Sequence, residues 1–263
     1  MALSAPSHDT LHFCARVADA YAKLIARGDA DSESGLRGSL FYAGALDEEG
    51  RTLVVAANIA GAATLAASAD RAAQKQAIRD GIADFLVNSL DEALRILKNQ
   101  LRKRETVAVS VAMEPAAMEQ EMNERGVAPD LVRSDVAIST KNERAYEELI
   151  QAPTLQEGAN GGAELAQTPA LVVWRADSGR HKDLATLDEI ALACLDADDW
   201  ATRRWLRLAP RYLGRMTQGL RLLTADREFL SRFEEQLTAR AARGEIAFPY
   251  EIRAYIRSDE VKP

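Results

Sequence analysis

The sequence between residues 52 and 135 contains four decisive stretches: Thr64-Leu-Ala-Ala-Ser-Ala-Asp70, Ile78-Arg-Asp-Gly-Ile-Ala-Asp-Phe-Leu-Val-Asn-Ser-Leu-Asp-Glu-Ala-Leu94, Thr106-Val-Ala-Val-Ser-Val111 and Arg125-Gly-Val-Ala-Pro-Asp-Leu-Val132. Short apolar runs alternate here with amphipathic helical patterns, which is typical of strands joined by helices. Such units form a parallel sheet with helices on both faces. We therefore expect an α/β protein with a doubly wound, mostly parallel sheet and an additional helical C-terminal portion.

Local signals predict where several helices begin and end. Ser89-Leu-Asp-Glu92 has the form of a capping box and is followed by a stripe of leucines at helical spacing. Pro115 suits the first position of a helix, and Gly126 suits the left-handed residue after a helix end. Residues 50–60 show no clear period, so the pattern alone leaves strand and helix open there.

Composition separates the chain into two parts. Residues 151–169 contain Gly158-Ala-Asn-Gly-Gly162 between two prolines, which indicates a flexible linker. We predict a sheet domain over residues 1–150, the linker over 151–169, and a mostly helical or α/β region over 170–263. An apolar run, Leu171-Val-Val-Trp174, is the strand candidate of that last region.

Charge and cysteine content exclude several classes of protein. The formal net charge of -7 over 263 residues argues against a general binder of polyanions such as nucleic acid. The two cysteines, Cys14 and Cys194, form no disulfide framework or zinc signature and favour a reducing compartment. The sequence has no signal peptide pattern and no long apolar membrane span. We expect a cytoplasmic protein with no membrane partner and no metal, and self-association stays open.

The sheet-forming stretch resembles the NAD-binding domain of urocanase (urocanate hydratase). The Ala60-Gly61 step, the helix start Asp91-Glu-Ala-Leu94 and the turn Arg125-Gly-x-x-Pro-Asp130 carry this resemblance, which covers residues 52–135. It implies a Rossmann-like fold, and it favours a helix over residues 50–60. It also implies an enzyme in which bound NAD is the electrophile that activates urocanate.

The positions that the resemblance assigns to NAD depart from the family pattern. A Gly-Gly-rich loop is replaced by Asp47-Glu-Glu-Gly50, and Glu114 with the following proline replaces a Gly-Asn pair. Ser68 replaces a glutamate expected at the adenosine ribose, although Asp70 is retained. Additional carboxylates would repel a pyrophosphate, which such folds bind through closely approaching backbone amides. We expect no cofactor, with NAD as the alternative, and regard Gly61, Ser68, Asp70 and Glu114 as degenerate cofactor positions.

A polar loop outside the resemblance is a candidate ligand site. Asp177-Ser-Gly-Arg-His181 follows the strand candidate at residues 171–174. Open α/β sheets bind ligands beyond the carboxyl ends of their strands, so Ser178, Arg180 and His181 could hold a small anion. The competing interpretation is an exposed loop without a ligand. A catalytic triad needs groups from separate elements, and we assign no nucleophile.

An arginine stripe is the second candidate outside the resemblance. Arg203, Arg207, Arg211 and Arg215 recur every four residues and share one helix face if Pro210 bends the helix without ending it. The stripe could bind phosphate or RNA. A charge run is more often a solvated face that pairs with nearby acids, and the neighbouring aromatics are expected to be buried.

Three hypotheses for function follow. The first is an enzyme of the urocanase group that hydrates urocanate or a similar small carboxylate. The second, which we favour, is a divergent or non-catalytic relative that kept the sheet and lost the NAD site. The third is a small-ligand or nucleic-acid binding module that uses the arginine stripe. Catalytic residues stay unassigned, because the family's Gln-Thr-Ser-Ala-His-like run after the Pro-Asp turn is missing.

Overall fold

The computed structural model describes residues 7–28, 30–31, 33–136, 146–149, 170–176, 180–217 and 219–257. The chain divides into two compact units. The parallel-sheet unit combines residues 16–139 with 211–216, and the antiparallel-sheet unit combines 1–15, 140–210 and 217–263. Residues 151–169, where we predict a linker, lie outside the described part of the chain, so the predicted domain boundaries stay a prediction.

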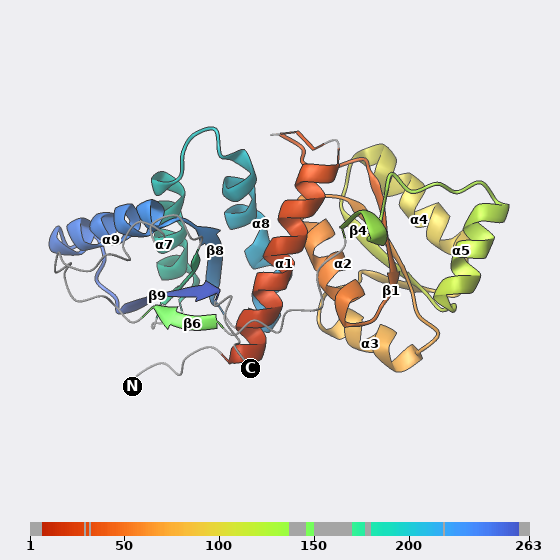
Figure 1. Cartoon of the computed structure of the whole chain (residues 1–263), viewed down its shortest axis with the longest axis horizontal. Helices are drawn as coiled ribbons and strands as arrows, with labels where there is room; N and C mark the ends of the chain where they lie inside the picture. Colours follow the sequence, from red (N-terminus) through yellow and green to blue (C-terminus); the bar gives the residue numbers. More distant parts are fainter. Residues whose placement is uncertain are drawn as a thin grey trace, which may run out of the picture. The chain divides into compact units, whose positions relative to one another are not determined.

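The parallel-sheet unit alternates strands and helices along the chain (Figure 1). Its elements are β1 (Leu40–Ala45), α2 (Glu48–Ala60), β2 (Ala63–Ala67), α3 (Arg71–Arg79), β3 (Phe85–Val87), α4 (Leu90–Lys103), β4 (Val107–Val111), α5 (Pro115–Glu124), β5 (Leu131–Val132) and the 3₁₀ turn η1 (Arg133–Val136). The strand order is β3-β4-β2-β1-β5, and every pair is parallel. The predicted α/β fold is confirmed.

Helices cover both faces of this sheet. Alternate strand residues point to opposite faces, and one set forms a single apolar core with α4 and α5. The members of this core include Leu40, Tyr42, Leu65, Val109, Leu90, Leu97 and Met118. On the opposite face, Gln74 of α3 donates from Nε2 to Ser110 Oγ at 3.1 Å, and α2 contacts β1, β2 and β4. Figure 1 shows α2 and α3 on one side of the sheet and α4 and α5 on the other.

The local helix signals have the expected effects. Ser89 accepts a hydrogen bond from Glu92 N–H at 3.3 Å, which confirms the predicted start of α4. Pro115 opens α5, and Gly126 adopts φ 64° after it. Residues 50–60 belong to α2, as the resemblance indicated, and Gly61 ends that helix with φ 102°. Almost all of α2 is buried, which explains why its sequence shows no amphipathic period.

Two aspartates fix the starts of the outer strands. Asp84 N–H donates to Ala108 O at 2.8 Å, and its Oδ2 accepts from Ala108 N–H at 2.8 Å. Asp130 repeats this arrangement with Leu40, at 3.0 Å for its N–H and 2.7 Å for its carboxylate. Each aspartate therefore extends the strand pairing by one residue and holds β3 or β5 in register.

Replacing Asp130 with alanine should lower the free energy of unfolding by about 1 kcal/mol, because Leu40 N–H loses its acceptor in a partly buried position. Denaturant unfolding followed by far-UV circular dichroism measures this change. Asp130→Asn keeps an acceptor oxygen and should lose clearly less. Equal losses for the two variants would show that the carboxylate oxygen does not hold β5.

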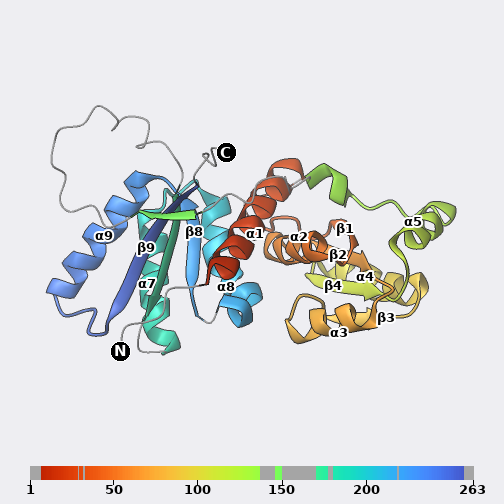
Figure 2. The same ribbon diagram turned by 60° about the horizontal axis from the view of Figure 1, so that its bottom comes forward.

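The antiparallel-sheet unit contains a four-stranded sheet of order β6-β9-β7-β8. Its elements include β6 (Tyr146–Leu149), β7 (Ala170–Ala176), α7 (His181–Cys194), β8 (Arg221–Ala225), α9 (Arg227–Ala242) and β9 (Tyr250–Arg257). Figure 2 shows β9, β7 and β8 side by side, with α7 and α9 close to them. Helices α1 (His8–Arg27) and α8 (Trp200–Thr217) have residues in both units.

Aromatic side chains organise the core of the antiparallel-sheet unit. Trp174 of β7 is fully buried and meets the Phe233 ring of α9 edge-on, with 5.3 Å between ring centroids. Trp205 of α8 donates from Nε1 to Leu222 O at 2.7 Å on β8, the last strand of the sheet. This bond satisfies a backbone acceptor at a sheet edge that would otherwise stay open.

Both cysteines are free and buried. Burial raises the pKa of the Cys14 thiol to about 12 and also raises the pKa of Cys194. Thiols with raised pKa values are poor nucleophiles, as is typical of cysteines that pack in a core.

Candidate functional site

The candidate site lies at the carboxyl edge of the parallel sheet. In open α/β sheets, ligands bind where the loops after two neighbouring strands leave toward opposite faces. β2 and β4 are such neighbours, because β2 leads to α3 on one face and β4 leads to α5 on the other. β1 is the next strand in the sheet, and its turn into α2 opens on the same edge.

The predicted cofactor positions fall on both edges of the sheet. Ser68 follows β2 and Glu114 follows β4, and Ser68 N–H donates to Val111 O at 3.0 Å, so the strand order brings these two turns together. Asp70 belongs to the same edge. Gly61 precedes β2 and therefore lies at the opposite, amino edge of the sheet. The structure thus groups three of the four positions.

The side chains of this group already have roles in the local fold. Asp70 is the N-cap of α3 and accepts from Ala72 N–H at 2.7 Å. Asp70 N–H in turn donates to Ser68 Oγ at 3.2 Å and closes the turn. Glu114 precedes α5 and is exposed, without a side-chain capping bond. Among these three side chains, only Glu114 makes no hydrogen bond that caps a helix or closes a turn.

The turn from β1 to α2 brings a carboxylate to the start of the helix. Asp47 is the N-cap of α2, and its Oδ1 accepts from Gly50 N–H at 2.7 Å. Glu48 and Glu49 occupy the first helical turn. Negative side chains are favoured here, because the first amides of a helix are unpaired donors and the helix dipole is positive at this end.

Gly50 allows α2 to approach β1 very closely. A Cβ atom at this position would lie 1.8 Å from Ala45 O, which is far inside any contact distance. In a G-x-G-x-x-G fingerprint, the third glycine serves this close helix-strand packing and the second lets a pyrophosphate approach the backbone. With Gly50 as the third glycine, Asp47 stands at the position of the second.

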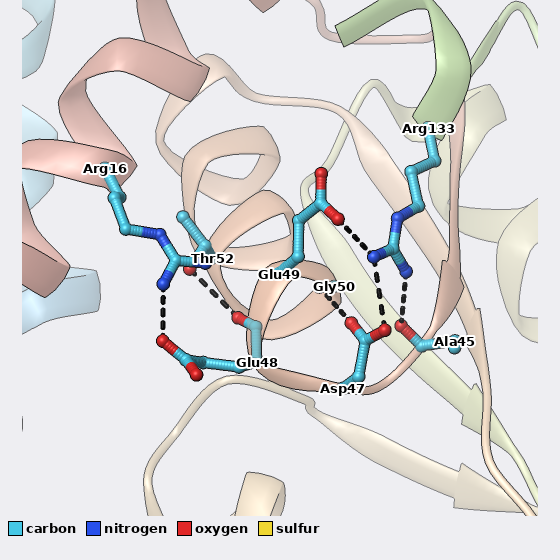
Figure 3. Close-up of polar contacts among 8 residues, drawn as sticks. All are labelled: Arg16, Ala45, Asp47, Glu48, Glu49, Gly50, Thr52 and Arg133. Carbon is cyan, nitrogen blue, oxygen red and sulfur yellow. Dashed lines mark hydrogen bonds and ion pairs between the residues drawn. The ribbon is translucent and has the colours of Figure 1, made fainter. Parts of the chain in front are cut away.

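An arginine after β5 completes the cluster (Figure 3). Arg133 Nη2 donates to Asp47 Oδ2 at 3.1 Å and also pairs with Glu49, and Nη1 donates to Ala45 O at 3.4 Å. Asp47, Glu49 and Arg133 are called the switch-point cluster below, because β1, whose turn into α2 carries the two acids, is the strand next to the switch point between β2 and β4. It ties the ends of β1 and β5, which are neighbouring strands. Arg16 of α1 pairs separately with Glu48, whose side chain is 80% exposed.

Residues 17–143 match the family model of the urocanase Rossmann-like domain. The match includes every strand of the parallel sheet and is longer than residues 52–135, which carry the resemblance. The parallel-sheet unit is therefore related to urocanase, while the match does not reach the antiparallel-sheet elements.

The urocanase likeness implies an NAD site, and the residues at the switch-point cluster do not fit a pyrophosphate. The Gly50 amide that would bind a phosphate oxygen already donates to Asp47. The Arg133 guanidinium that could neutralise a phosphate already bridges two carboxylates. A dinucleotide would have to displace these bonds and approach Asp47 and Glu49 against charge repulsion.

The sequence alone did not single out Arg133. Arg133 is 84 to 86 residues from its two acidic partners, so pairing them requires the strand order. An arginine directly after the last apolar strand of a parallel sheet was the available signal. The sequence placed Asp47 and Glu49 in a loop before a helix, whereas the structure makes Asp47 the N-cap of α2 and puts Glu49 in its first turn.

Replacing Arg133 with glutamine should lower the free energy of unfolding of the urocanase-related sheet by about 1 kcal/mol, because two carboxylates then face each other without a cation. Circular dichroism at low and high salt measures the loss, which should shrink as salt screens the repulsion. Arg125→Gln is the matched control, since Arg125 also joins two carboxylates but on a more exposed surface. A larger loss for the control would contradict the importance of the switch-point cluster.

The other predicted ligand residues lie in the antiparallel-sheet unit. Ser178 lies outside the described residues. Arg180 directly precedes α7 and pairs with the buried Asp183, with Nε 2.8 Å from Oδ2. His181 is the exposed first residue of α7. Arg180 therefore has a partner within the fold, and a ligand role for these residues stays a prediction.

The arginine stripe on α8 is not one uniform surface. The helix continues through Pro210, as the stripe requires. Arg203 caps the end of α7, because Nη1 donates to Leu192 O at 2.9 Å and to Leu195 O at 3.3 Å. Arg207 and Arg211 are exposed, and the Arg215 side chain lies outside the described residues. At least one member of the predicted stripe thus has a structural task.

The described residues contain neither a membrane-spanning helix nor a cluster of metal ligands. No helix among them is both long and apolar enough to cross a membrane. Within the same residues, no group of histidine, cysteine, aspartate and glutamate side chains is arranged to hold a metal ion.

Proposed function

We propose that this urocanase-related protein is a non-catalytic relative that holds no NAD and does not hydrate urocanate. The observation that carries the proposal is the hydrogen bond between Asp47 Oδ1 and Gly50 N–H, at 2.7 Å. It places a fixed negative charge of the chain at the helix start where a dinucleotide phosphate would bind.

The neighbouring turns support the same proposal. Asp70 serves as the N-cap of α3, and Ser68 offers no acidic group for a ribose. In the urocanase reaction, as the resemblance implies, NAD is the electrophile, so a sheet without NAD has no route to that hydration. What remains is a stable α/β scaffold suited to binding or regulating a partner.

Urocanate absorbs in the ultraviolet, and loss of this absorbance in the presence of purified protein tests the proposal. We expect no loss with or without added NAD. Loss of absorbance that depends on NAD would instead support the hydratase hypothesis. An authentic urocanase in parallel samples serves as the positive control for substrate and cofactor.

A further inference from the structure

We infer that Asp47 and Glu49 act as a built-in substitute for a bound anion, and that these two carboxylates are the residues that exclude phosphate groups from the switch-point cluster. The inference rests on the proposed function and adds which side chains cause the exclusion. It also implies that the remaining parts of an anion site are still present beneath these side chains.

The first of these parts is a backbone donor at the start of α2. Gly50 N–H donates to Asp47 Oδ1 at 2.7 Å, as it would to an oxygen of an external anion. The close approach of α2 to β1 is preserved by Gly50, whose Cβ would otherwise meet Ala45 O at 1.8 Å. The helix start is therefore positioned as in a phosphate-binding turn, with the Asp47 carboxylate in the place of the phosphate.

The second part is the guanidinium of Arg133. It reaches this turn from the end of β5 and contacts Asp47 and Glu49. The side chain of Arg133 is 27% exposed, that of Asp47 is 52% exposed and that of Glu49 is 18% exposed. Two carboxylates face one guanidinium, so the cluster carries a net negative charge. Without the two carboxylates, the same place would carry a net positive charge and a free backbone donor.

The double variant Asp47→Gly/Glu49→Gln tests this inference with inorganic pyrophosphate as the probe. Glycine is acceptable at an N-cap, and the backbone of residue 47, at φ -76° and ψ -170°, is extended. Isothermal titration should show that the double variant binds pyrophosphate at least about tenfold more tightly than the wild-type protein does. The reason is that the pyrophosphate can then accept hydrogen bonds from the helix start and pair with Arg133.

Two controls separate this effect from a general change of charge. Glu48→Gln removes a charge from the same helical turn, but Glu48 pairs with Arg16 and does not contact Gly50 N–H or Arg133, so pyrophosphate binding should not change. Adding Arg133→Gln to the double variant should abolish the gain. Retention of the gain in this triple variant would overturn the assigned role of Arg133.

A milder pair, Asp47→Asn/Glu49→Gln, retains the capping bond and serves if the glycine variant does not fold. It should show a smaller gain that still depends on Arg133. Folded variants that bind pyrophosphate no better than the wild-type protein would overturn the inference. That outcome would leave the proposed function intact, which fails only if the wild-type protein itself turns over urocanate with NAD.

Discussion

Replacing Gly50 with alanine is expected to destabilise the parallel-sheet unit by about 3 kcal/mol. The new Cβ would lie 1.8 Å from Ala45 O and 3.0 Å from Ala45 C, and both are backbone atoms that cannot turn away. Either α2 must move away from β1 or the end of β1 must shift. Both movements would also disturb Asp47 and Arg133, so loss of stability and loss of the switch-point cluster should occur together.

Gly126→Ala is the matched control for this substitution. Gly126 has φ 64°, and a Cβ there would meet no atom within 4 Å, so its cost is the backbone strain of about 1 kcal/mol alone. Far-UV circular dichroism during denaturation measures both variants. The three tryptophans, Trp174, Trp200 and Trp205, belong to the other unit, so tryptophan fluorescence follows the antiparallel-sheet unit in the same samples. Equal costs for the two glycines would contradict the close approach at Gly50.

Replacing Asp188 with alanine should have a comparably large effect on the antiparallel-sheet unit, about 3 kcal/mol. Asp188 Oδ1 accepts from Trp174 Nε1 at 3.0 Å, and its Oδ2 accepts from Arg221 Nε at 2.8 Å. Trp174 is fully buried and the Arg221 side chain is 8% exposed. The substitution would leave a buried cation and a buried indole N–H without this acceptor, and tryptophan fluorescence during unfolding would report the loss.

Asp188→Asn is the control, because it keeps an acceptor for Trp174 and should lose less than the alanine variant. Burial raises the pKa of Asp188, and Arg221 only partly opposes this shift. For an acid whose folded pKa lies above its unfolded value, stability is lost as pH rises through the folded pKa. The stability of wild type relative to Asp188→Asn should therefore fall over that pH range. A difference that does not depend on pH would contradict the burial of this carboxyl group.

Much of the parallel sheet could be predicted from the sequence, because its strands are short apolar runs separated by helices with clear start signals. The capping box at Ser89 and the proline at residue 115 gave helix starts that the structure confirms. Helix α2 was ambiguous because Thr52–Ala60 are all buried, and a buried helix has no polar face to reveal its period. In this case the family resemblance supplied the correct assignment.

The second sheet was only partly foreseen. The sequence predicted β7 from its apolar run, whereas β9 is amphipathic and reads Tyr250-Glu-Ile-Arg-Ala-Tyr-Ile-Arg257. Alternation of apolar and charged residues with a period of two was the available signal for that strand. β8 is short and begins with the buried Arg221, so its pattern gives little indication of a strand.

The candidate site shows the same limit of sequence reasoning. Asp47 and Glu49, at the start of α2, are close together in the chain, and the sequence alone indicated that they would repel a phosphate. Their cation comes from β5, and only the strand order β2-β1-β5 brings Arg133 beside them. The sequence therefore predicted repulsion of an anion, while the structure adds that a guanidinium balances part of that charge and holds the acids in place.

The NAD content of the purified wild-type protein shows whether the parallel sheet has lost its cofactor site. Nucleotides released by denaturing the protein can be separated by chromatography and quantified, and equilibrium dialysis of native protein against labelled NAD extends the test to weaker binding. With Asp47 in place of a phosphate, the protein should carry no NAD and retain none in dialysis. One NAD per chain, in either measurement, would contradict the account.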